Sequence, residues 1–216
     1  AALQRKGKRM EKRFLSKYGA SDEKNFPLSA IDNEILAPAF GLKQVISEDS
    51  GSPIDYSNAV FIGTIRMGYG HYRIGMALAS AAYAKGFIPH WHDLLGFDSA
   101  GARAIRDLDK WYSLGSRISQ KSKLFNKLLW DPLMGKWYKR FSKNYPVVQA
   151  SRIFSDTLKN IPPETPFLAT HPFNAHGAMH AGLNRVVNIV PDNCPLGFHI
   201  APGAIHTVQS PSAYFI

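Results

Sequence analysis

Disulfide chemistry and membrane-spanning segments are the first things that this sequence lacks. Of its 216 residues only Cys194 is a cysteine, and one thiol cannot close a disulfide within the chain, which fits a reducing compartment. No apolar run approaches the roughly 20 residues that a helix needs to cross a bilayer. The basic first residues are not followed by the apolar core of a secretion signal. We therefore expect a cytoplasmic protein.

Acidic residues are also scarce. The chain has 16 Asp or Glu against 26 Lys or Arg, a net charge of +10 and an isoelectric point near 9.7. Such an excess of positive charge indicates an anionic partner, which is a membrane lipid, a nucleic acid or a phosphorylated small molecule. The sequence has no helix-turn-helix, zinc knuckle or RNP-like aromatic strand, so we expect no nucleic acid.

The basic residues gather in two segments. Residues 3–18 carry seven Lys or Arg against one Glu, which is typical of a solvated basic helix and also of a segment that binds an anionic surface. Residues 99–152 carry twelve Lys or Arg against three Asp, with apolar residues at helical spacings of three and four. We expect amphipathic helices there, broken near Asp131-Pro132, whose aromatic side chains face either the protein core or a membrane interface. The residues that would touch the membrane are Trp111, Trp130, Lys136, Trp137 and Arg140.

A glycine turn between a buried strand and a helix is the central motif. Residues 59–65 form an apolar, β-branched run typical of a fully buried strand. Gly68, Gly70 and His71 follow at once, and the helix after them ends at Gly86. The start of a helix has unpaired N–H groups and a positive dipole, so it tends to hold an anionic or strongly polar ligand. The same dipole favours a neutral imidazole at His71, which suits a general base; the alternative is a ring that only packs the turn.

Further strands alternate with helices along the chain. We expect strands at 87–93, 166–170, 185–190 and 204–209, with a small-residue helix at 173–183. The alternation predicts the α/β class, with a Rossmann-like parallel sheet and helices on both faces. Ligands bind such sheets at the carboxyl ends of the strands. The polar residues expected at that edge are His92, Asp93, His171, Asp192 and Asn193.

The expected organisation has two parts. Residues 1–58 form a basic amino-terminal extension, and residues 59–216 form the Rossmann-like domain. The helices at about 99–152 exceed what a crossover between parallel strands needs, so we interpret them as an insertion. Because the chain starts without Met and ends on an apolar run, we expect it to be a piece of a longer protein.

A dinucleotide cofactor would use some of the same residues. Gly68 and Gly70 fit the dinucleotide fingerprint, but the third glycine, Gly75, comes two positions late. Asp93 stands where the acid that binds the ribose belongs. A nucleotide-dependent oxidoreductase therefore stays open as a less favoured alternative.

A metal site has weaker support. We expect His90 and His92 to point to opposite faces of their strand, which spoils them as a pair. His176 and His180 share one face of a helix, but no Glu follows His176 as in the zinc-binding pattern His-Glu-x-x-His. We expect no metal and no other resident cofactor.

The order of several short motifs resembles a known family. These motifs are the strand before Gly68-Tyr69-Gly70-His71-Tyr72-Arg73, then His171-Pro172 after a strand, and then Pro191-Asp192-Asn193 running through His199 to Pro202-Gly203. Residues 59–216 are similar in this respect to the amino-terminal domain of the monogalactosyldiacylglycerol synthase and processive diacylglycerol glucosyltransferase family. That family is related more distantly to the undecaprenyl-linked glucosaminyltransferase of peptidoglycan synthesis.

The resemblance implies a fold and an activity. Enzymes of this family have the GT-B fold, in which an amino-terminal Rossmann-like domain binds the lipid acceptor and a carboxy-terminal one binds the nucleotide sugar. The chain would be the first half, and the nucleotide-sugar domain would be absent from it. The nucleotide sugar is then a co-substrate rather than a cofactor.

The resemblance also implies roles for single residues. His71 takes the role of the family's base or acceptor-site histidine, in a loop where Tyr69 stands in place of the usual glycine. The residues expected to bind the substrate are Gly68, Tyr69, Gly70, Tyr72, Arg73, His92, His171, Asp192, Asn193 and His199.

Together these inferences predict a hexosyltransferase acting in glycolipid synthesis. It would work on a lipid or polyprenyl-like acceptor, as a peripheral protein on the inner, anionic face of the membrane. The alternative is a non-catalytic lipid- or sugar-binding module of the same half-fold. Neither the sugar, the acceptor nor the oligomeric state follows from the sequence.

Overall fold

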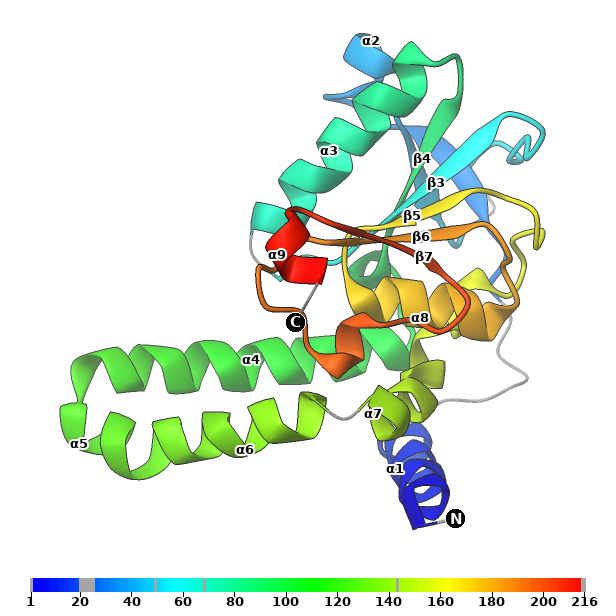
Figure 1. Ribbon diagram of the computed structural model, residues 1–216. Helices are drawn as coiled ribbons and strands as arrows, with labels where there is room; N and C mark the ends of the chain where they lie inside the picture. Colours follow the sequence, from blue (N-terminus) through cyan, green and yellow to red (C-terminus); the bar gives the residue numbers. More distant parts are fainter. Residues whose placement is uncertain (1, 20–25, 49, 68, 143, 215–216) are drawn as a thin grey trace.

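A seven-stranded sheet forms the centre of the protein in the computed structural model, which describes residues 2–19, 26–48, 50–67, 69–142 and 144–214 (Figure 1). The strands are β1 (Ser29–Asp32), β2 (Lys43–Ile46), β3 (Ala59–Thr64), β4 (Ile88–Asp93), β5 (Phe167–Ala169), β6 (Val186–Val190) and β7 (Ile205–Val208). The longer helices are α1 (Ala2–Tyr18), α3 (Tyr69–Ala84), α4 (Ala100–Lys121), α6 (Asp131–Phe141), α7 (Asn144–Ala150) and α8 (Pro172–Ala181). Short helices are α2 (Ala37–Phe40), α5 (Lys123–Phe125) and α9 (Pro211–Tyr214).

The strand order is β1-β2-β4-β3-β5-β6-β7, and every neighbouring pair is parallel except β1 with β2. The predicted α/β class with a largely parallel sheet is therefore confirmed. The order reverses at β3: the chain crosses from β3 to β4 in one direction, and later strands add on the other side. Parallel strands place their carboxyl ends at one edge, and a reversal of this kind opens a crevice there.

Helices cover both faces of the sheet, because successive side chains of a strand point to opposite sides. On β3, Phe61 belongs to the cluster packed under α8, while Val60 and Ile62 belong to the cluster packed under α3. All six residues of β3 are buried. This explains why the strand reads as a continuous apolar run rather than an alternating one.

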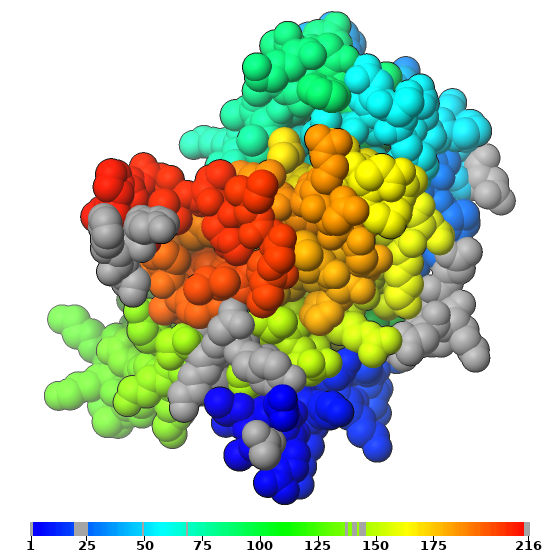
Figure 2. Space-filling model, turned by 45° about the vertical axis from the view of Figure 1, so that its right-hand side comes forward, coloured from blue at the N-terminus to red at the C-terminus, as the bar shows by residue number. Residues whose placement is uncertain are grey.

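The predicted boundary between an extension and the main domain does not match the sheet. Residues 29–46, which we placed in the extension, supply β1 and β2, and β2 pairs with β4. The helix α1 is not a free solvated helix either. Its Glu11 is 9% exposed and accepts hydrogen bonds from Gln149 Nε2 at 2.6 Å and Arg152 at 3.5 Å. These contacts attach α1 to α7 and the turn that follows it, and α1 lies at the bottom of the molecule in the space-filling view (Figure 2).

The segment between β4 and β5 is helical, and its outer part projects from the body of the molecule (Figure 1). We call residues 110–141 the helical arm. The predicted break near Asp131-Pro132 is wrong: α4 ends at Lys121, Ser122 starts the next turn, and a π-helical segment, η2 (Asn126–Trp130), leads directly into α6. Pro132 has no N–H to donate, and it follows the π-helical turn in which the Asp131 N–H donates to the Asn126 carbonyl, so the chain passes this position without a break.

Close packing of α3 on the sheet predicts a large cost for a side chain at Gly75. A Cβ there would lie 2.7 Å from the ring of Trp91 and 2.9 Å from Thr64. We expect Gly75→Ala to lower the free energy of unfolding by about 1–3 kcal/mol, as overpacking does, although alanine favours helix by about 1 kcal/mol. Urea unfolding measures the difference.

Gly70 offers the matched control in the same helix. A Cβ at Gly70 has nothing within 4 Å, so Gly70→Ala is expected to leave the stability unchanged or to raise it by up to about 1 kcal/mol. Equal stability of the two alanine variants would contradict close packing of α3 as the reason for the glycine at position 75.

Candidate functional site

Residues from three strand ends meet beside the start of α3. His71 lies in the first turn of α3 and is partly buried, and its Nδ1 is 2.5 Å from the backbone carbonyl oxygen of Thr170, just beyond β5. The next residue, His171, packs its ring edge-on against that of His71, with centroids 4.8 Å apart. The sheet thus joins residues almost a hundred positions apart in the sequence.

The contact with Thr170 fixes which nitrogen of His71 carries the proton. A carbonyl oxygen only accepts hydrogen bonds, so Nδ1 of His71 must donate. In the neutral ring Nε2 is then unprotonated and keeps its lone pair. The side chain is therefore held by one nitrogen while the other can accept a proton.

His171 has the opposite arrangement. Its Nδ1 accepts the backbone N–H of Phe173 at 3.1 Å and so caps the start of α8. The neutral ring therefore carries its proton on Nε2. Burial lowers the pKa of His171 well below its usual value, and the neighbouring His71, His199 and His176 lower it further. His171 is accordingly a neutral hydrogen-bond donor near neutral pH.

The loop after β6 adds a carboxylate and a third imidazole. His199 accepts the backbone N–H of Leu196 at Nδ1, 2.8 Å away, and its Nε2 lies 2.9 Å from Asp192 Oδ2. His199 is buried, whereas the carboxylate of Asp192 is 55% exposed. Burial lowers the pKa of His199, partly offset by Asp192. The pair presents an oriented carboxylate on the same edge as His71.

Asp93, at the carboxyl end of β4, forms structural contacts in place of the expected ribose contact. Asp93 Oδ2 pairs with Arg66 Nε at 2.6 Å, and Asp93 Oδ1 accepts the backbone N–H of Leu95 at 2.9 Å. Burial raises the pKa of Asp93, while Arg66 opposes the rise. With both carboxylate oxygens engaged, Asp93 is not free to bind a ribose, so the dinucleotide alternative loses its acidic residue.

Several of the expected substrate-binding residues do lie on the ligand edge. Tyr69 is 83% exposed, Gly70 and Arg73 are also exposed, and all three belong to the first turns of α3. Asn193 is exposed and accepts a hydrogen bond from Gln209 at 2.6 Å. Gly68 lies outside the described residues.

Two expected substrate-binding residues are turned away from this edge. Tyr72 packs edge-on against Trp91, with ring centroids 4.9 Å apart, in the cluster between α3 and the sheet. His92 is fully buried and stacks on Phe97 with centroids 4.8 Å apart. A helix and a strand each present only one face to a site, and these two side chains belong to the other face.

One argument used against a metal site was wrong: His90 and His92 do not point to opposite faces of their strand. Residues two apart on a strand share a face, and the rings of His90 and His92 both pack among the aromatic side chains under α8. His176 and His180 donate to different backbone carbonyls, those of Phe198 and Val148. Across the part of the chain that the structure describes, no group of three or more His, Cys, Asp or Glu could hold a metal ion.

The expected membrane contacts of the arm fall into different environments. Trp111 is 69% exposed and Lys136 is exposed. Trp130 instead fills the space against α4, where a Cβ on Gly115 would overlap its ring, so it stabilises the arm rather than facing outward. The side chains of Trp137 and Arg140 lie outside the described part.

The sequence did not reveal which backbone groups and which distant residues contact the site residues. The acceptor for His71 is a main-chain oxygen, which leaves no trace in residue identity, and Arg66 precedes the glycine loop without a motif of its own. The alternation of strands and helices along the chain indicated only that some polar residues lie at the carboxyl edge of the sheet.

Fold and site together define an α/β protein whose mostly parallel sheet has His71, His171 and His199 at its carboxyl edge. The chain belongs to the family described as Domain of unknown function (DUF6937), whose model matches residues 1–216. No curated protein and no solved structure matches it. Among the described residues, no helix is both long enough and apolar enough to cross a membrane.

Proposed function

We propose that this chain is the acceptor-binding half of a GT-B glycosyltransferase, which moves a sugar from a nucleotide sugar to a hydroxyl group of a lipid or other acceptor at a membrane surface. The observation that carries the proposal is the environment of His71. One ring nitrogen is fixed by the Thr170 carbonyl, and the other is left unprotonated in the neutral ring, at the start of α3 beside the carboxyl ends of the strands. That is the arrangement a general base needs.

In this reaction Nε2 of His71 removes the proton from the acceptor hydroxyl as the oxygen attacks the anomeric carbon. The bond between that carbon and the diphosphate breaks, and the nucleoside diphosphate leaves. The N–H groups at the start of α3, together with Arg73, offer positive potential to phosphate groups nearby. Most contacts to the nucleotide would come from a second Rossmann-like domain.

The sugar-transfer step is tested in cells that overproduce the natively encoded protein. With a radiolabelled sugar in the medium, we expect a labelled lipid to accumulate in cells that overproduce the wild-type protein. We expect no such accumulation in cells that overproduce His71→Ala. Unchanged lipid labelling in both strains would favour the non-catalytic binding module. The 83% exposure of Tyr69 weighs against that module, since Tyr69 does not close the loop.

The arm supports the membrane part of the proposal. It exposes a row of large apolar side chains: Trp111, Tyr112, Leu114, Ile118, Leu124, Leu128, Leu129, Leu133 and Tyr138. Between them the arm carries eight Lys or Arg and one acidic residue, Asp131. Exposed apolar side chains among basic ones suit an interface where chains enter the lipid and cations meet phosphate.

Sedimentation with liposomes tests this role of the arm. We expect salt-sensitive binding to anionic vesicles, because each Lys or Arg at the surface contributes about 1 kcal/mol that salt screens. The double variant Leu124→Ala/Leu128→Ala removes side chains that are 69% and 67% exposed, so it should fold normally and bind about tenfold more weakly.

The matched control removes equally exposed apolar side chains elsewhere. Ile35 and Ile205 are 83% and 67% exposed and lie off the arm, so Ile35→Ala/Ile205→Ala should bind vesicles as the wild type does. An equal loss in both double variants, or no vesicle binding at all, would overturn the membrane role.

A further inference from the structure

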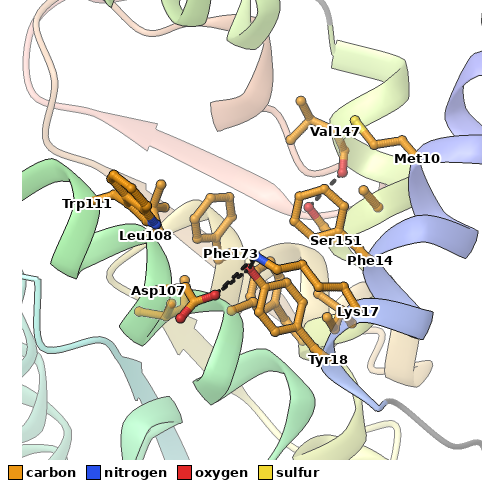
Figure 3. A pocket seen from close by; sticks show the side chains of 15 residues that line it. Met10, Phe14, Lys17, Tyr18, Asp107, Leu108, Trp111, Val147, Ser151 and Phe173 are labelled. Carbon is orange, nitrogen blue, oxygen red and sulfur yellow. Dashed lines mark hydrogen bonds and ion pairs between the residues drawn. The ribbon is translucent and has the colours of Figure 1, made fainter.

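An apolar cavity of about 280 Å³ lies beside the histidine edge, between α1, the base of α4, α7 and the start of α8 (Figure 3). We infer that this cavity binds the hydrocarbon chain of an amphiphilic lipid acceptor, next to the edge that carries His71. The inference rests on the proposed function and deepens it, because it assigns the acceptor's tail to a particular site.

The lining of the cavity selects for an apolar ligand. Most of its side chains are hydrocarbon or aromatic: Met10, Phe14, Ala104, Ile105, Leu108, Trp111, Val147, Ala150, Ile153, Phe154 and Phe173. The hydroxyl of Ser151 is already used, since it donates to the Val147 carbonyl at 2.7 Å. A buried water needs two to four polar partners, so a hydrocarbon chain suits this lining better than water does.

The size of the cavity fits one chain rather than a bulky group. Small-molecule pockets typically measure about 300–1,000 Å³, and this cavity of about 280 Å³ lies just below that range. At roughly 30 Å³ for each water-sized group, this volume corresponds to about nine such groups. That corresponds to a single medium-length hydrocarbon chain.

The mouth of the cavity is polar and exposed. Lys17 Nζ donates to Tyr18 Oη at 2.7 Å and to Asp107 Oδ2 at 3.1 Å, and the last two side chains bond to each other at 3.2 Å (Figure 3). Lys17 and Asp107 are 56% and 48% exposed. An apolar interior below a polar rim is the shape that takes an amphiphile tail first.

Phe173 connects the cavity to the histidines. Its ring lines the cavity and packs against His171 with centroids 4.8 Å apart, and His171 in turn packs against His71 at the same centroid distance. On the other side Trp111 belongs both to the cavity and to the exposed row of the arm. The cavity therefore lies between the surface proposed to meet lipid and the proposed base.

Contacts at two places hold α1 as one wall of the cavity. Arg103 donates to the carbonyl of Tyr18, at the end of α1, at 3.1 Å from Nε and 2.7 Å from a terminal nitrogen. Glu11 is held from the other side by Gln149 and Arg152. Anchored at both places, α1 forms one wall without filling the space, and this gives its basic segment a use beyond surface charge.

Fluorescence of cis-parinaric acid, an 18-carbon chain, tests the inference without vesicles and below the micelle concentration. We expect saturable binding of one probe per chain, displaced by monolauroylglycerol and not by glycerol. Ala150→Phe fills the cavity and should weaken binding at least about tenfold, while Trp111→Ala, at a 69% exposed position, should weaken it several-fold without affecting folding.

Two controls decide the outcome. Ala81→Phe adds the same ring at an exposed position of α3 outside the cavity, and Leu124→Ala removes an apolar side chain of the arm that is also 69% exposed. Both should bind the probe within about twofold of the wild type. No saturable binding, or equal losses in the controls, would overturn the tail site.

The result also separates this inference from the proposed function. Probe binding with unchanged lipid labelling in His71→Ala cells would keep the tail site and remove the transferase. Labelling that depends on His71, without probe binding, would do the reverse. If Ala150→Phe does not fold, Trp111→Ala against Leu124→Ala still gives the answer.

Discussion

Replacing His71 with alanine is expected to lower sugar transfer about 10²- to 10⁴-fold, the usual contribution of a positioned general base. The reason is the fixed proton on Nδ1: with that N–H donated to Thr170, only Nε2 can take the acceptor's proton. The measurement is the rate of label incorporation into lipid at equal protein levels.

His71→Gln separates the chemical role from a structural one. Its amide N–H₂ can still donate to the Thr170 carbonyl, but the side chain has no basic nitrogen. We expect it to fold as the wild type does and to be nearly as inactive as His71→Ala. As a control, His206→Ala removes an exposed histidine of β7 and should keep full activity. Activity retained in His71→Gln would show that the ring only supports the turn.

Acid should destabilise the protein strongly between pH 6.5 and about 4. Burial lowers the pKa of His92 and of His176 to about 4, whereas an unfolded chain titrates near 6.5. The unfolded state therefore binds more protons in this window, so stability is complete above pH 6.5 and falls as the pH approaches 4. Each ring lowers the free energy of unfolding by about 3 kcal/mol across this window. The two rings together account for about 6 kcal/mol, which is comparable to the total stability of many domains.

His92→Phe tests this assignment. Urea unfolding at pH 7.5 and pH 4.5 gives the loss of stability for each protein, and we expect the variant to lose about 2–3 kcal/mol less than the wild type. Carboxylates titrate in both proteins and cancel in the comparison. His206→Phe, at a more exposed position, should change the loss much less. An identical acid loss in the wild type and His92→Phe would contradict the burial of that ring as the cause.

Local sequence patterns were sufficient for the regular elements around the site. The expected strands at 59–65, 87–93, 185–190 and 204–209 correspond to β3, β4, β6 and β7, with ends shifted by a residue or so. Their apolar runs are short, β-branched and bounded by glycine or polar residues, which is a signal contained within each segment. β1 and β2 were missed because their sequences, Ser-Ala-Ile-Asp and Lys-Gln-Val-Ile, mix one or two β-branched residues with charged or polar ones and so form no apolar run.

The environment of each site residue required the assembled sheet. The alternation of strands and helices predicted that His71, His171 and Asp192 share an edge, but not that His71 donates to a carbonyl 99 residues away. It also placed His92 at the ligand edge, although the pleat turns that ring into the aromatic core. Sequence spacing gives the position of a residue along its strand, whereas packing decides whether its side chain faces the site or the core.

By itself, then, the sequence determined the class of fold, the edge of the sheet at which the polar residues gather, the excess of positive charge and the presence of amphipathic helices, since all of these follow from composition and short-range periodicity. Only the tertiary structure decided the tautomer of His71, the burial of His92 and Tyr72, the ion pair of Asp93 with Arg66 and the cavity behind Phe173. The physical reason is that each of these depends on contacts between segments far apart in the chain, whose partners exist only after the sheet has brought them together.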